Sequence, residues 1–91
     1  MATILLRRRH ELGIKKARLA AQKVADDLAD EYGIESGWDG NVLRFSRHGL
    51  DGTLTVGRNE VALEARLGLL LSAFRSSIED RVQQEFDRYF A

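Results

Sequence analysis

The side chains that could do chemistry gather near the start of the chain. Seven basic residues and one acid lie in residues 1–23, whereas the rest of the chain carries seven basic and thirteen acidic residues. An anion could bind there, such as nucleic-acid phosphate, an acidic partner or an anionic boundary layer. Equally, the segment could be an alternating strand and a solvated helix face whose cations pair with acids elsewhere. The candidate binding residues are Arg7, Arg8, Arg9, Lys15, Lys16 and Lys23.

Other residues offer little chemistry. His10 and His48 lack a ligand spacing such as H-x-x-x-H, so we expect no metal site. Asp39 and Asp51 stand beside glycines near predicted turns, where aspartate has a backbone role. The chain has no cysteine, which excludes disulfides and thiolate chemistry. No nucleophile elbow or phosphate loop is present. We therefore expect no catalytic residue and no cofactor, and a protein that is not an enzyme.

The elements that position the basic residues are a strand and a helix. A strand is predicted over residues 3–9, which are apolar and β-branched first. A helix follows, with Gly13 as its N-cap and Gly33 as its C′ residue. The lysines lie toward its N-terminal end and the acids toward its C-terminal end, which the helix dipole disfavours by about 0.3–1 kcal/mol per charge. The predicted core-facing stripe is Ile14, Ala17, Ala21, Val24, Ala25, Leu28 and Tyr32.

Four short strands follow, joined by turns that contain glycine. Apolar and polar residues alternate along them, which is typical of an antiparallel sheet covered on one face only. Asp39-Gly40 is a strong signal for a two-residue hairpin turn in which both residues have φ > 0. The predicted strands cover residues 35–38, 42–47, 50–56 and 61–67.

A long amphipathic helix is predicted from Gly68 to the end of the chain. Its predicted core-facing stripe is Leu71, Phe74, Ile78, Val82, Phe86 and Tyr89, and Leu69, Leu70 and Phe90 fall outside it. A helix of this length spans about 31 Å, whereas the strands span only about 17–23 Å. It must therefore cross the sheet diagonally, with a frayed end, or overhang it. An overhang would expose three aromatic residues as an apolar tip for a dimer or surface contact. Those residues are Phe86, Tyr89 and Phe90.

Composition sets the remaining limits. The 91 residues make one domain, residues 1–91. No apolar run approaches the roughly 20 residues of a transmembrane helix. The three arginines end the only early apolar run, so we expect no signal peptide and a cytoplasmic protein.

Several short patterns along the chain point to one family. The first part shows Ile4-x-Leu6-x-Arg8-x-His10, Ala17-Arg18, and Tyr32-Gly33 leading to Trp38-x-Gly40. The second part shows Leu43-x-Phe45, Gly49-x-x-Gly52-x-Leu54-x-Val56 and Val61-x-Leu63-x-x-Arg66-Leu67-Gly68. These patterns resemble the small bacterial family of putative polyhydroxyalkanoic acid system proteins over nearly the whole chain. The resemblance implies a bacterial protein linked to storage granules and transfers no catalytic residue. Gly13 departs from the serine-like N-cap expected there.

We predict an α+β fold in the order β-α-β-β-β-β-α, with a four- to five-stranded antiparallel sheet and both helices on its apolar face. The predicted function is that of a non-enzymatic accessory protein of polyhydroxyalkanoate granule metabolism. It would contact a granule surface or granule protein through the basic residues or the aromatic tip, and the last helix could also form a homodimer.

Two alternative functions stay open. A nucleic-acid-binding module would use the basic residues, but it lacks interleaved aromatic residues and net positive charge. A small-ligand domain would need a pocket between helix and sheet, where Phe45, Phe74 and Ile78 leave little room.

Overall fold

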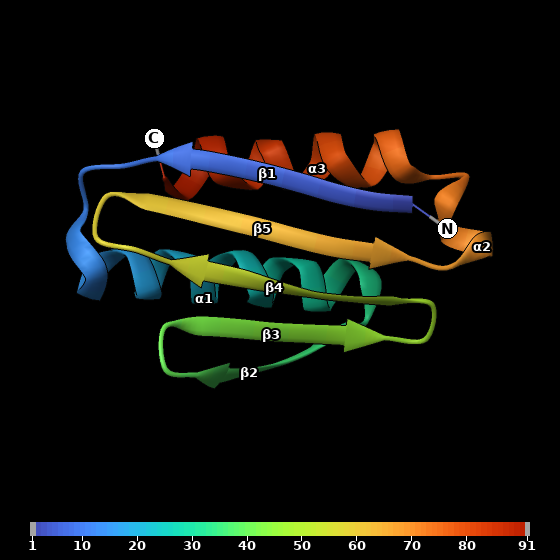
Figure 1. Ribbon diagram of the computed structural model, residues 1–91, viewed down its shortest axis with the longest axis horizontal. Coiled ribbons are helices and arrows are strands. Elements are labelled where there is room, and N and C mark those ends of the chain that lie inside the picture. Colours follow the sequence, from blue (N-terminus) through green and yellow to red (C-terminus); the bar gives the residue numbers. More distant parts are fainter. Residues whose placement is uncertain (1, 91) are drawn as a thin grey trace.

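The computed structural model describes residues 2–90. Five strands form one antiparallel sheet, and the two long helices lie side by side on one of its faces (Figure 1). The predicted α+β class and the two-layer arrangement are confirmed, with one short helix in addition. In chain order the elements are β1 (Ala2–Arg9), α1 (Gly13–Tyr32), β2 (Glu35–Asp39), β3 (Val42–Arg47), β4 (Leu50–Val56), β5 (Glu60–Leu67), α2 (Leu69–Ser72) and α3 (Arg75–Tyr89).

The sheet has the strand order β1-β5-β4-β3-β2. Strands β2 to β5 are consecutive hairpins, which local turns can specify. Strand β1 instead pairs with the last strand, from Ala2 opposite Leu67 to Arg9 opposite Glu60. The two edges of the sheet are therefore β1 and β2, and α3 lies behind β1 while α1 lies behind β3 and β4.

Helix α1 packs on the sheet through small residues, which lets the two layers approach closely. It begins at Gly13 itself, so Gly13 is not the preceding cap, and it ends as predicted at Gly33, whose N–H donates to the Ala29 carbonyl at 2.8 Å. The predicted core position of Ile14 is wrong, because this side chain is 36% exposed while Ala20 is buried. Ala20 lies on the side of α1 that faces α3, and α3 covers that side of the helix.

The first hairpin turn differs from its prediction by one position. Asp39 pairs with Val42, so the two loop residues are Gly40 and Asn41. Only Gly40 has a positive φ, at 62°. This is the pattern of a type II′ turn, which needs glycine at its first central position, whereas the predicted turn has φ > 0 at both.

Residue 52 in β4 must be a glycine, because neighbouring atoms lie too close to leave room for a side chain. Gly52 pairs with Phe45 on one side and Ala65 on the other. A Cβ built there would lie 2.3 Å from the carbonyl oxygen of Glu64 and 2.7 Å from Cζ of Phe45. The Phe45 ring therefore occupies the space that a side chain at residue 52 would need.

The predicted single terminal helix is wrong, because it is broken into α2 and α3. The Gly68 N–H donates to the Gly49 carbonyl at 2.8 Å, which ties the start of α2 to the β3–β4 turn. Phe74 leaves helical geometry, with φ −106° and ψ 15°. The 15 residues of α3 span about 22 Å, close to the length of β1 and β5. Helix α3 therefore lies along the sheet without an overhang, which was one of the two arrangements considered for the longer helix.

Candidate functional site

The three arginines do not form one surface. Because side chains alternate along a strand, Arg7 and Arg9 lie on the open face of the sheet and Arg8 lies on the helix face. Arg8 Nη2 is 2.7 Å from the Asp87 carboxylate on α3, and Arg7 Nη1 is 3.3 Å from that of Glu60 on β5. Two of the three cations therefore pair with acids of the same chain.

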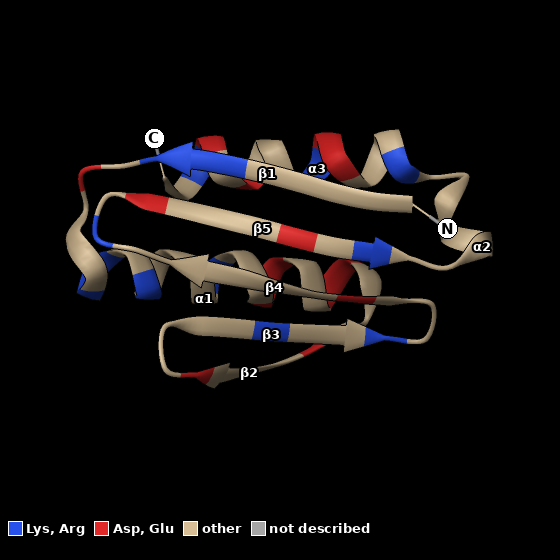
Figure 2. Cartoon of the chain, in the orientation of Figure 1, with Lys and Arg blue, Asp and Glu red and all other residues tan. Residues whose placement is uncertain are grey.

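The three lysines lie on helix α1, whereas the three arginines lie on strand β1. Figure 2 shows the cations of β1 and those at the start of α1 toward the same end of the molecule, on separate elements. Lys15 and Lys16 are exposed on the first turns of α1, whereas Lys23 Nζ lies 5.9 Å from the ring centre of Tyr89. The predicted cluster is thus spread over several faces.

The predicted apolar tip at the end of the chain is not exposed. Phe86 and Phe90 are each 1% exposed, and their rings meet edge to face with centroids 5.6 Å apart. Phe90 also packs against the ring of His10. Tyr89 is partly buried, and its hydroxyl donates to Asp27 at 2.8 Å. A homodimer through this helix stays a prediction, but Phe86 and Phe90 face the core in this structure.

An exposed apolar tip lies instead at the other end of the terminal segment. Leu69 is 82% exposed, Leu70 is 83% exposed and Phe74 is 58% exposed. We call these three residues the α2 tip. Leu71 packs over Gly49, and the Ser72 hydroxyl donates to the Gly68 carbonyl at 2.8 Å, so the turn that presents the tip is held in place. A group of exposed large apolar side chains is a candidate interaction surface.

A polar network joins α1 to α3. Glu85 is only 1% exposed, and it accepts a hydrogen bond of 2.6 Å from Arg81 Nη1. The Nε of Arg81 donates to Glu31 on α1. Close by, Asp27 on α1 accepts the hydrogen bond from Tyr89. The network therefore crosses the interface between the helices at two places.

The two carboxyl groups in this network have opposite pKa shifts. Burial raises the pKa of Glu85, the hydrogen bond from Arg81 opposes this, and the nearby charge of Asp27 raises it further. The hydrogen bond from Tyr89 lowers the pKa of Asp27, and the charges of Arg88 and Arg81 lower it further. Glu85 thus keeps its proton to higher pH, and Asp27 ionises first.

Carboxyl groups with separated pKa values can act as a general acid and a general base. At 1% exposure, however, the Glu85 side chain offers a substrate no access. The pair therefore acts within the protein, by joining the helices. Sequence reasoning did not identify this pair. The available signal was the i, i+4 spacing of Arg81 and Glu85.

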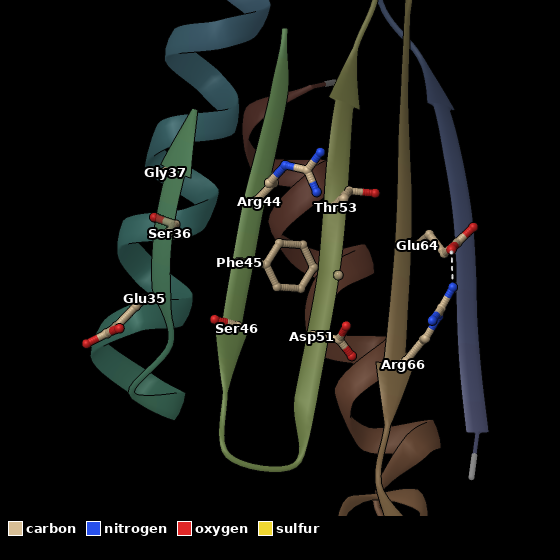
Figure 3. Close-up of a pocket in the computed structure, with 11 residues that line it drawn as sticks. Glu35, Ser36, Gly37, Arg44, Phe45, Ser46, Asp51, Thr53, Glu64 and Arg66 are labelled. Atoms are coloured by element: carbon tan, nitrogen blue, oxygen red, sulfur yellow. Dashed lines mark ion pairs between the residues drawn. The ribbon is translucent and has the colours of Figure 1, made fainter. Parts of the chain in front are cut away.

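The open face of the sheet carries a shallow depression of about 550 Å³ (Figure 3). Its charged lining residues are exposed and of both signs: Glu35, Arg44, Asp51, Glu64 and Arg66. Arg66 Nη2 and Glu64 Oε1 are 4.0 Å apart. Because neighbouring charges of opposite sign largely cancel in water, this face fits solvation better than the capture of a charged ligand.

His10 belongs to the core rather than to the basic surface. It is 5% exposed, and its Nδ1 accepts a hydrogen bond of 3.2 Å from the Leu12 N–H. In the neutral ring Nε2 therefore carries the proton, and no protein group in residues 2–90 accepts it. The ring closes the end of the core beside Phe90.

Residues 2–90 contain neither a clustered set of metal ligands nor a helix that could span a membrane. No group of three or more His, Cys, Asp or Glu side chains in this part of the chain is placed to hold a metal ion. Nor does any helix within these residues combine the length and the apolar character needed to span a membrane.

Comparison with known proteins identifies the family but no individual relative. No curated protein and no solved structure matches the chain. A family model described as "Putative polyhydroxyalkanoic acid system protein" matches residues 4–90. The match spans all the elements described above except the first two residues of β1. The chain therefore belongs to this family, whose name links it to the polyhydroxyalkanoic acid system.

Proposed function

We propose that this protein is a non-enzymatic accessory protein of the polyhydroxyalkanoic acid system. It acts in the cytoplasm by docking the α2 tip on the apolar surface of a storage granule, formed by the polymer or by its bound proteins. The exposure of Leu69, Leu70 and Phe74 is the observation that carries this proposal. The family name supplies the granule context.

The α2 tip suits an extended apolar surface better than a pocketed ligand. The three exposed residues lie in and just after α2, which stands at one end of the long axis of the molecule (Figure 1). Burying a leucine or phenylalanine side chain stabilises a complex by about 1.5–3 kcal/mol. Three partly exposed ones contribute roughly 4–6 kcal/mol on this scale, before the cost of association is subtracted. Docking by one molecule is therefore weak and reversible.

The test is co-sedimentation of the purified protein with isolated polyhydroxyalkanoate granules. The test variant carries Leu69→Ser and Leu70→Ser. The matched control carries Leu5→Ser, because this leucine is 68% exposed on β1, outside the α2 tip. We expect the test variant to lose most of its binding and the control to keep it, at low and at high salt.

Three results would overturn the proposal. Equal loss in both variants would mean that any exposed leucine makes the protein adhere. Release by salt or by competing DNA would move the contact to the cations, since phosphate contacts weaken steeply with salt. Absence of wild-type binding would remove the granule surface as a partner.

A further inference from the structure

A second apolar surface lies between the outer side of α1 and the indole of Trp38. It is an open groove of about 570 Å³. Leu19 is 60% exposed there and Ile14 is 36% exposed, although both lie on a helix whose opposite side packs on the sheet. We call it the Trp38 groove, and its lining residues are Ile14, Lys15, Arg18, Leu19, Gln22 and Trp38.

The wall of the Trp38 groove is held in a defined position. The indole Nε1 of Trp38 donates to Gln22 Oε1 at 2.8 Å, and Gln22 in turn donates to Asp26 at 2.9 Å. The guanidinium carbon of Arg18 lies 4.6 Å from the centre of the Trp38 rings. An edge strand and α1 are thereby joined, and the groove between them is preformed.

The charge of the Trp38 groove is of one sign. Lys15 and Arg18 line it and no acidic residue does. The first turn of α1 contains no acid either, so the positive end of the helix dipole adds to the same field. Cations at this end of a helix are repelled by the positive end of its dipole. A bound anion would reduce that repulsion.

We propose that the Trp38 groove docks an acidic amphipathic helix of a partner protein. The apolar side chains of such a helix would pack on Leu19, Ile14 and the edge of Trp38, and its carboxylates would pair with Lys15 and Arg18. The groove follows α1 from Ile14 to Gln22, about 12 Å, which matches two turns of a docked helix.

This choice of partner follows from the shape and the chemistry of the groove. It is open along its length, whereas small-molecule sites enclose most of the ligand surface. Nucleic acid would need free aromatic faces for base stacking, and Arg18 already lies over the ring of Trp38. The groove lies near the start of α1, at the opposite end of the long axis from α2 (Figure 1), so both surfaces can be occupied together.

The test uses the fluorescence of Trp38, which is the only tryptophan. The probe is a synthetic peptide of about four helical turns, with leucines on one face and glutamates on the others. Controls are the same peptide with lysines in place of the glutamates and a single-stranded oligonucleotide. We expect a saturable change in Trp38 emission with the acidic peptide alone, with a Kd below about 1 mM that rises with salt.

Two adjacent lysines provide the matched variants. Lys15 lines the groove, whereas Lys16 lies about 100° further around the helix, and both are exposed. Lys15→Glu should raise the Kd by about fivefold or more and Lys16→Glu by less than about twofold, because only close charges interact strongly through water. Replacing Leu69 and Leu70 should leave this binding unchanged, which separates it from granule docking.

Four results would overturn the proposal. They are no saturable change with the acidic peptide, an equal response to the lysine peptide, an equal effect of the two lysine variants, and tighter binding of the oligonucleotide. A change in emission with protein concentration alone would identify a second copy as the occupant instead.

Discussion

Replacing Phe86 with alanine should destabilise the fold several times more than replacing Phe74 with alanine. Both rings belong to the predicted apolar stripe of the terminal helix. The structure separates them, because Phe86 is 1% exposed in the core and Phe74 is 58% exposed in the α2 tip. The pair therefore tests where this segment buries its aromatic residues.

The expected difference follows from transfer and cavity effects. Phe86→Ala removes a fully buried ring and leaves a cavity, at a cost of about 3–5 kcal/mol. Phe74→Ala removes a ring that is mostly in water and leaves no enclosed cavity, so the cost is about 1 kcal/mol or less. A domain of 91 residues has a free energy of unfolding of about 5–14 kcal/mol. The first variant should therefore lose much of its stability and the second little.

Urea denaturation followed by helical circular dichroism measures both changes. With a slope of about 1–1.5 kcal/mol per molar urea, the midpoint for Phe86→Ala should fall by about 2–5 M and that for Phe74→Ala by less than about 1 M. Phe86→Leu is a milder variant that keeps the fold measurable. Equal destabilisation by Phe74→Ala and Phe86→Ala would refute the burial described here.

Two further predictions concern the sheet and the helix interface. Gly52→Ala should destabilise the fold by about 1–3 kcal/mol or more, because the added Cβ would overlap its neighbours. The control Gly37→Ala should change stability by less than about 1 kcal/mol, because nothing lies within 4 Å of a Cβ at residue 37. Equal effects of the two variants on thermal unfolding would contradict the close packing at residue 52. Because the pKa of Glu85 is raised in the folded state, its contribution to stability is present below the unfolded pKa of about 4.3 and is lost as pH rises through the folded pKa. Glu85→Gln, whose side chain cannot ionise but can still accept the hydrogen bond from Arg81, should therefore gain stability relative to wild type from pH 4 to pH 7, and parallel pH profiles would exclude this role.

Local patterns predicted most of the secondary structure. Alternation located β3 and β4 at their observed bounds, because side chains of period two and turn residues are properties of neighbouring positions. The strand order could not be predicted, since nothing local to β1 shows that it pairs with β5. The break at Phe74 was missed for a similar reason. No proline or glycine marks it within residues 69–78.

The candidate site was predicted less well than the fold. The cations on the first turns of α1 are exposed, as expected for a solvated helix face. The ion pairing of the arginines could not be predicted, because it depends on acids that face β1 from α3 and β5. The helical periodicity of the terminal segment correctly placed Phe86 in the core and left Leu69 and Leu70 outside the apolar stripe. It was wrong for Phe74, which is exposed where the helix breaks, and for Phe90, which is buried against Phe86 and His10.

The pairing of the first strand with the last has a consequence for synthesis of the chain. The ribosome adds roughly 5–20 residues per second, so the end of β5 at residue 67 is synthesised about 3–12 s after the end of β1. During that time β1 has two free edges, and free strand edges favour pairing between chains. Like charges oppose such pairing, so Arg7, Arg8 and Arg9 would keep the waiting strands of neighbouring nascent chains apart. The acids that neutralise two of these arginines, Glu60 and Asp87, arrive only with the segments that complete the fold.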